Sequence, residues 1–287
     1  MSDRTTTRAR AWALTRRDGL VLGFTDHDRD LVFDGITFRA GAGMTASALV
    51  QAAGLATDNT EAAGALSDAG LTEADILAGR YDGAELVIHE VDWTDTAARR
   101  ILFRGTLGEI TRAGGAFRAE LRGLSEPLSI GGGRVFGTLC PAVLGDARCG
   151  FDLGQAGFSV EAALTAVSGG GARLDLPEMP EFAADWFVDG SVRFLTGAAE
   201  GLVAMVRREE PLGALRRLHL WAAPGAMPVA GDRVRLVAGC DKRLETCRYK
   251  FSNVLNFQGF PHVPADDWLM ATPSASDENA GGSLTNG

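Results

Sequence analysis

Four cysteines, the only ones in this 287-residue chain, form two pairs that lie far apart in the sequence. Cys140 and Cys149 have eight residues between them, and Cys240 and Cys247 have six. About ninety residues separate the two pairs. Two pairs at such spacings indicate either a four-thiolate metal site or two disulfides. We therefore take all four cysteines as candidate cofactor-binding and metal-ligating residues.

The lengths of the two loops bear on what the thiols could bind. Paired cysteines of structural zinc sites usually have two to four residues between them, because a tight turn wraps one small ion. Loops of six and eight residues are long enough to surround a wider group such as a [4Fe-4S] cluster. They also suit two hairpin disulfides, which are rare in a reducing cytosol. From spacing alone the alternatives are a [4Fe-4S] cluster, Zn²⁺, disulfides and unrelated buried thiols.

The residues around the cysteines favour an anionic cluster. Pro141 follows Cys140 and stiffens its turn, and Cys-Pro also occurs in ferredoxin-type cluster sequences. Four thiolates need neighbouring cations, and we expect backbone amides near Gly150 and Gly239 to donate to the sulfurs. The basic residues within three positions of a cysteine are Arg148, Lys242, Arg243, Arg248 and Lys250.

A cluster held in this way would join two segments of the chain. Redox ferredoxin sequences place three cysteines close together in one loop, whereas these pairs are distant. No flavin or nicotinamide fingerprint accompanies the cysteines. We therefore expect a structural role, in which the binding energy of the metal site becomes folding energy.

Two stretches of the chain resemble phage tail proteins. Residues 239–264 hold the second cysteine pair, two asparagines and a closing Phe-Pro-His-Val-Pro. With Cys140-Pro141 and Cys149, they resemble the iron-sulfur C-terminal domain of the lambda-like tail-tip protein L. The whole chain, including GFTDHDRDL at residues 23–31, is similar to the tail hub proteins of gene transfer agents and siphophages.

The resemblance implies a structural baseplate protein without catalytic residues. It implies a homotrimer in which each subunit carries one [4Fe-4S] cluster on its four cysteines. Such a hub would link the distal tail ring to the central tip or fibre protein and form part of the passage for DNA. We expect it to be made in the bacterial cytoplasm and assembled into the tail of a virion-like particle. The alternatives are a cytosolic zinc- or cluster-binding enzyme subunit and a tail-associated cysteine hydrolase using Cys140 or Cys149.

Length and composition predict a mainly β protein with a few short helices. The 37 glycines recur between short apolar runs, which is typical of turn-rich β structure. A chain of this length most naturally forms two domains, and both read as small barrels or sandwiches. We place a β-rich hub or ring domain at residues 1–125, a cysteine-bearing β domain at 126–265, and a flexible tail at 266–287.

The charge and hydropathy of the chain limit its partners. A net charge of −9 disfavours a nonspecific nucleic-acid binder, because such proteins cluster Lys and Arg. An acidic wall would instead let DNA pass without trapping it. No apolar run is long enough to span a bilayer, and the first residues lack the apolar centre of a secretory signal.

Local patterns predict several elements. Thr72-Glu73-Ala74-Asp75 is a capping box that opens a short helix, which Gly79 can close. The spacing of Asp26, Asp28 and Asp30 is that of calcium loops, but the later Gly and Glu are missing, so we expect a solvated turn. The other expected elements include strands at 20–25 and 31–39, a helix or loop at 45–65, and a hairpin of 101–111 with 116–122.

Overall fold

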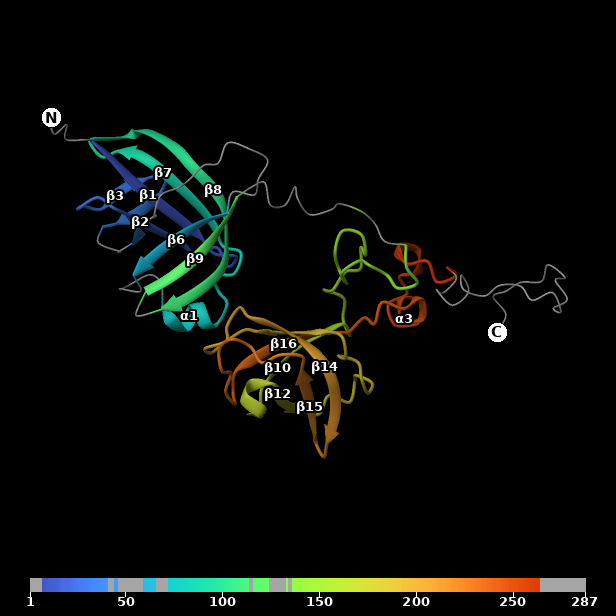
Figure 1. Cartoon of the computed structure of the whole chain (residues 1–287). Helices are drawn as coiled ribbons and strands as arrows, with labels where there is room; N and C mark the ends of the chain where they lie inside the picture. Colours follow the sequence, from blue (N-terminus) through green and yellow to red (C-terminus); the bar gives the residue numbers. More distant parts are fainter. Residues whose placement is uncertain are drawn as a thin grey trace, which may run out of the picture. The chain divides into compact units, whose positions relative to one another are not determined.

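The computed structural model describes residues 7–40, 44–45, 59–65, 72–113, 116–123, 133 and 136–263 (Figure 1). The chain divides into two compact units, residues 1–132 and 133–287, and each is described by itself. One sheet organises each unit, so the predicted mainly β fold is confirmed. The expected tail at 266–287 lies outside the described residues. The limits placed at 125/126 and 265/266 stay a prediction.

The first unit is a nine-stranded sheet in the order β3-β4-β2-β1-β7-β8-β9-β6-β5. Neighbouring strands are antiparallel except for the parallel pair β2 and β4. The elements are β1 (Arg8–Thr15), β2 (Val21–Thr25), β3 (Leu31–Phe33), β4 (Ile36–Arg39), β5 (Met44–Thr45), β6 (Asn59–Ala65), α1 (Glu73–Leu77), β7 (Glu85–Asp92), β8 (Asp95–Ala113) and β9 (Ala116–Gly123).

Strand β1 is buried on both of its faces. Trp12 and Leu14 pack into one core, whereas Ala11 and Ala13 pack into another. Successive side chains of a strand point to opposite faces, so the two cores lie on the two sides of the sheet. This strand was not predicted from the sequence, because a strand buried on both faces shows no alternation of polar and apolar residues.

The predicted short helix is confirmed as α1. The Thr72 hydroxyl accepts a hydrogen bond from the Asp75 backbone N–H at 3.2 Å, and Gly79 follows the last turn with φ of 70°. The predicted hairpin is also confirmed, since β8 and β9 are antiparallel neighbours and Ala113 lies opposite Ala116.

Two local predictions were wrong. The single strand expected at 31–39 is a hairpin, because Asp34 and Gly35 both have positive φ, as a two-residue turn of type I′ requires. Within 45–65, where a helix or loop was expected, residues 59–65 form β6, which pairs along its whole length with β9. Residues 46–58 lie outside the described part.

The second unit contains a seven-stranded antiparallel sheet in the order β10-β16-β13-β14-β15-β12-β11. Its apolar core includes Phe187, Phe194, Leu174, Leu218 and Leu236. The elements are β10 (Ser159–Ala163), β11 (Ala166–Ser168), η1 (Gly169–Gly171), β12 (Arg173–Pro177), β13 (Ser191–Phe194), β14 (Val203–Leu212), β15 (Leu215–Leu220), β16 (Arg233–Val237), α3 (Leu244–Tyr249) and η2 (Val254–Asn256).

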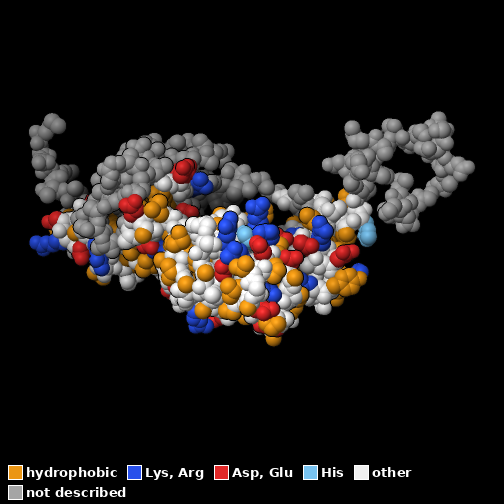
Figure 2. Space-filling view, turned by 90° about the horizontal axis from the view of Figure 1, so that it is seen from below, with side chains coloured by type: hydrophobic (Ala, Val, Ile, Leu, Met, Phe, Trp, Pro, Cys, Tyr) orange, Lys and Arg blue, Asp and Glu red, His pale blue; other side chains and the backbone are white. Residues whose placement is uncertain are grey.

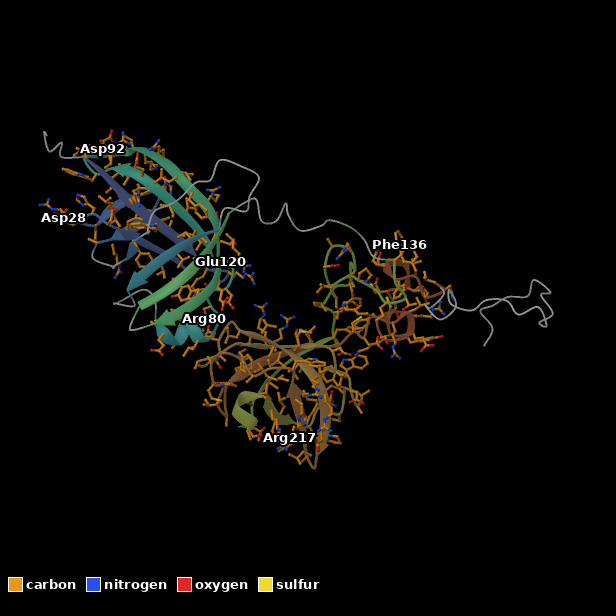
Figure 3. All side chains as sticks on the ribbon, viewed as in Figure 1. Asp28, Arg80, Asp92, Glu120, Phe136 and Arg217 are labelled. Atoms are coloured by element: carbon orange, nitrogen blue, oxygen red, sulfur yellow. The ribbon has the colours of Figure 1, made fainter. Side chains whose placement is uncertain are left out.

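Strand β14 joins the two halves of this sheet. Its first part pairs with β13 and its later part with β15, and a bulge interrupts the register between Val206 and Arg208. A half-buried ion pair supports the second half, where Arg217 donates to both carboxylate oxygens of Asp175 at 2.6 and 2.8 Å. Arg217 is labelled on this sheet in Figure 3. This scaffold carries the loops that hold the cysteines.

His89 on β7 is a buried group without a hydrogen-bond partner for Nδ1 among the described residues. Its ring meets Phe33 and Phe38 edge to face, and burial lowers its pKa from 6.5. The unfolded chain therefore takes up a proton at a higher pH than the folded chain does. Stability is fully present above about pH 6.5 and falls as the pH drops through that value.

We expect His89→Leu to stabilise the chain by about 1 kcal/mol and to flatten this dependence, because it removes an orphaned polar atom. Thermal unfolding of the full chain between pH 5 and pH 8 measures both effects. His262→Leu, at an exposed position, is the control. An unchanged pH profile in the His89 variant would show that this histidine does not govern acid stability.

Candidate metal centre

All four cysteines line one small pocket in the second unit. They are free thiols, each half-buried. The labelled Phe136 marks the loop region that carries them, beside helix α3 (Figures 1 and 3). The lining residues are Cys140, Ala142, Leu144, Cys149, Cys240, Lys242, Arg243, Cys247, Phe251, Asn253, Asn256 and Phe257.

Asp146 shapes the loop between the first two cysteines. Its carboxylate accepts hydrogen bonds from the backbone N–H groups of Val143, Arg148 and Cys149 at 3.0, 2.9 and 2.7 Å. The bond from Cys149 is the main reason that the pKa of Asp146 lies below its usual value. One acidic side chain thus fixes the backbone on which Cys149 stands.

The second pair is placed by a close backbone approach and a short helix. The Gly239 N–H donates to the Trp186 carbonyl at 3.0 Å, and a Cβ at Gly239 would lie 1.5 Å from the Val188 carbonyl oxygen. Only glycine fits there, and Cys240 follows directly. Cys247 lies on α3, a short helix that was not predicted from the sequence.

Lys242 and Asn253 connect the two distant segments. The Lys242 carbonyl accepts from the Cys140 N–H at 2.9 Å, and its ammonium donates to the Ala142 carbonyl at 2.8 Å. The Asn253 amide donates to the Cys149 carbonyl at 2.7 Å and lies 3.6 Å from its sulfur. The Asn253 N–H also donates to the Cys247 carbonyl at 2.9 Å. The pairs therefore meet through protein contacts alone.

An aromatic cluster anchors these loops to the sheet. Phe151, Phe158 and Phe251 contact one another, with ring centroids 4.7 to 5.5 Å apart. Lys250, which ends α3, donates to the Trp186 carbonyl at 2.6 Å and lies 4.4 Å from the centre of the Trp186 ring. The pocket thus rests on a small apolar core of its own.

The electrostatics of the pocket depend on burial and on the crowding of thiols. Burial, followed by the charges of the other three cysteines, raises the pKa of Cys247 to about 11. Burial also raises the pKa of Cys240, although a hydrogen bond from the Lys242 N–H opposes it. Burial therefore favours the protonated form of these two thiols.

Several expected neighbours of the sulfurs lie elsewhere. Only two of the five basic side chains, Lys242 and Arg243, line the pocket. The Arg148 guanidinium instead pairs with Asp146 at 3.6 Å, and Arg248 is exposed. The amides of Gly150 and Gly239 themselves donate to the carbonyls of Asp146 and Trp186. These two N–H groups close the loops. The donors that lie near sulfur are the Lys242 N–H, at Cys240, and the Asn253 side-chain amide, at Cys149.

The donor set fits a soft, electron-poor metal group. Four sulfurs, two cations and two asparagines face the pocket, and its described lining contains no Asp or Glu. Thiolates select zinc, copper(I) and iron-sulfur clusters over hard cations. The cavity measures about 20 Å³, so a cluster would fit only if the site widened around it. In the described part of the chain, no group of three or more His, Cys, Asp or Glu is placed to hold a single metal ion.

The other candidate site in the sequence is a turn, as expected. The Asp26 carboxylate accepts from the Arg10 N–H at 2.7 Å, and the Asp30 carboxylate accepts from the Ala40 N–H at 2.8 Å. These aspartates cap backbone amides. His219 is half-buried on β15, where it lies 3.0 Å from a Glu210 carboxylate oxygen.

The described surface facing the viewer in Figure 2 mixes apolar, basic and acidic side chains, and several basic side chains gather near the centre of the view. Among the helices that the structure describes, none has the length and apolar character to cross a membrane.

Comparisons with known proteins identify the family of the chain. The family model "Baseplate hub protein, N-terminal attachment domain" matches residues 1–152, and "Phage conserved hypothetical protein BR0599" matches residues 185–267. The chain therefore belongs to the baseplate hub family of phage-type tails. Each of the two matched ranges of the chain contains one cysteine pair.

A solved structure extends this likeness over nearly the whole chain. A chain from the virion of a native gene transfer agent particle is 53% identical, with a TM-score of 0.89. The match covers 98% of this chain and 96% of that chain. The search of the curated proteins found no match.

The four cysteines were predicted from the sequence, but the residues that position them were not. Asp146 lies three residues before Cys149, a spacing typical of side chains that cap a turn. This local spacing could therefore have predicted the role of Asp146. The contacts of Lys242 and Trp186 join residues about 60 to 100 positions apart, and no local pattern in the sequence indicates them.

We expect Asn253→Ala to weaken metal retention by about 10- to 100-fold, as loss of an outer hydrogen-bond partner typically does. The change removes the amide that orients Cys149 and leaves every thiol in place. Competition with a chelator, followed by metal analysis of the protein, measures the effect. Gln155→Ala, at an exposed position in the same region, serves as the control. Equal retention by both variants would show that Asn253 does not support the site.

Proposed function

We propose that this chain is a structural hub of a gene-transfer-agent-like tail, and that its four cysteines hold one structural [4Fe-4S] cluster. The observation that carries the cluster is the convergence of four free thiols from two distant segments on one pocket. Each paired loop is longer than zinc turns require. The pocket's cations suit an anionic group. Bound there, the cluster supplies cross-links between the two segments.

Hub membership supports the proposed place of the chain in the particle. The N-terminal match is to an attachment domain, and the solved relative is part of a virion. We propose a homotrimer between the distal tail ring and the central tip or fibre protein. Two β units in each of three chains can present six similar surfaces, which is one way to connect sixfold and threefold rings. The acidic balance of the chain suits a passage for DNA.

The hydrolase alternative has weaker support. A nucleophilic cysteine needs a base within hydrogen-bond reach, and no histidine is among the described residues that line the pocket. Cys140→Ser separates the two functions. An enzyme would keep its fold and lose activity, whereas the proposed hub loses iron and stability.

Removing the cluster should loosen the second unit alone. We expect Cys240→Ser, or chelation of the wild type, to make residues 133–263 sensitive to protease while residues 7–123 stay protected. Limited proteolysis with mass mapping of the fragments measures this. Leu255→Ser is the control, because Leu255 lies in the same region and is 97% exposed. If the cluster-free protein resists protease and assembles normally, the cluster is not a structural cross-link.

The hub role predicts the position and number of copies in assembled particles. Cryo-electron microscopy of particles should show three copies in one ring at the tail end, with Asp or Glu side chains toward the lumen. A monomer in solution is compatible with interfaces that form only on the growing tail. Finding the protein absent from particles and turning over a small molecule would instead support the enzyme alternative.

A further inference from the structure

A groove lies beside the cysteine pocket in the second unit, with a volume of about 550 Å³. Its floor is the outward face of β13, β14 and β16, opposite the apolar core. Its other side is formed by the loop after Cys140 and by Cys240 and Lys242. The volume lies within the range of about 300–1,000 Å³ typical of binding sites.

The strand register sets the chemistry of the floor. Arg235, Arg193 and Val203 lie side by side across β16, β13 and β14. Two residues along, Ser191 on β13 faces Met205 on β14. Residues two apart on a strand share a face, so these two rows form one surface. Val203 and Met205 are 50% and 48% exposed, which gives a basic half beside an aliphatic half.

The two arginines form an unfavourable pair in the free chain. Arg193 and Arg235 are directly opposite on neighbouring strands, where like charges repel. Arg235 donates to the Ser159 hydroxyl at 3.1 Å, and neither arginine forms an ion pair with an acid in the described part of the chain. Lys242 adds a third cation, and Asp189 is the only carboxylate among the described lining residues. A ligand with carboxylates would relieve this repulsion.

We propose that the groove binds a carboxylate-bearing, aliphatic segment of a neighbouring tail protein. The inference rests on the proposed hub function, which supplies such neighbours. Paired guanidinium groups bind carboxylates in a forked geometry, and the segment's aliphatic side chains cover Val203 and Met205. A protein segment suits the aliphatic half of the floor better than a nucleic acid does.

The groove shares a side with the cysteine pocket. Cys240 and Lys242 line both, and Lys242 also binds the segment of Cys140 and Ala142. A metal group on the cysteines would therefore fix one side of the docking groove, and these shared residues would couple metal loading to attachment of the neighbour.

Arg193→Gln tests the proposal, because it removes one repulsive charge and one docking group. We expect the melting temperature of the purified chain to stay equal or rise, while its incorporation into particles falls about tenfold. Arg207→Gln is the matched control on β14, since Arg207 lies over the Trp221 ring outside the groove. If the Arg193→Gln variant melts at a lower temperature and loses iron, Arg193 only supports the fold and the docking proposal is overturned. Normal incorporation would also overturn the proposal.

A photo-crosslinking residue at Met205 in assembled particles identifies the occupant. We expect a cross-link to an Asp- or Glu-containing peptide of another tail protein. A cross-link to DNA, to residues 264–287 of this chain or to a second copy of it would overturn the proposal, as would no cross-link. The iron content of the same preparations reports the cluster separately. Particles with zinc in place of iron but an intact cross-link would refute the cluster and keep the groove.

Discussion

The second unit depends on bringing two cysteine pairs, about ninety residues apart, to one pocket. The protein contacts that do this include the two hydrogen bonds that Lys242 makes with Cys140 and Ala142, those of Asn253, and a small aromatic core. Each hydrogen bond contributes only about 0.5–1.5 kcal/mol net. In the chain-entropy model, a covalent cross-link over a loop of this length reduces the entropy of the unfolded chain. This raises the free energy of the unfolded state by about 4–5 kcal/mol. A metal group bridging the pairs would therefore outweigh any single contact that positions them.

The protein contacts arrange the pocket, and the proposed metal group would add to them. The Asp146 turn and the close approach at Gly239 set the backbone before any metal binds. The thiols themselves crowd together, and burial raises the pKa of Cys247 and Cys240. Burial thus favours the protonated form of Cys240 and Cys247, and a bound metal group would reverse that preference. On the outer face of the sheet, Arg193 lies opposite Arg235 on the neighbouring strand, and their like charges repel. We attribute this unfavourable pair to assembly with a neighbouring protein.

How far the sequence predicts this structure depends on whether the signal is local. The cysteine pairs, the Thr72 cap of α1 and the hairpin of β8 with β9 follow from neighbouring residues, and all were predicted. Strand β1 was missed because both faces are buried and no alternation remains. Helix α3 was missed because it is short and its N-cap residue Arg243 makes no capping hydrogen bond. The groove was missed because it depends on which strands are neighbours, and strand register joins residues more than forty positions apart.

Native mass spectrometry of the chain, purified without oxygen, tests the central claim most directly. One [4Fe-4S] cluster adds about 350 Da to each chain, and Cys140→Ser or Cys247→Ser should lose that increment. A gain of about 65 Da would indicate one zinc ion on the same thiols. A loss of about 4 Da would indicate two disulfides. Either result, or an unshifted mass in freshly isolated protein, would contradict a [4Fe-4S] cluster on these four cysteines.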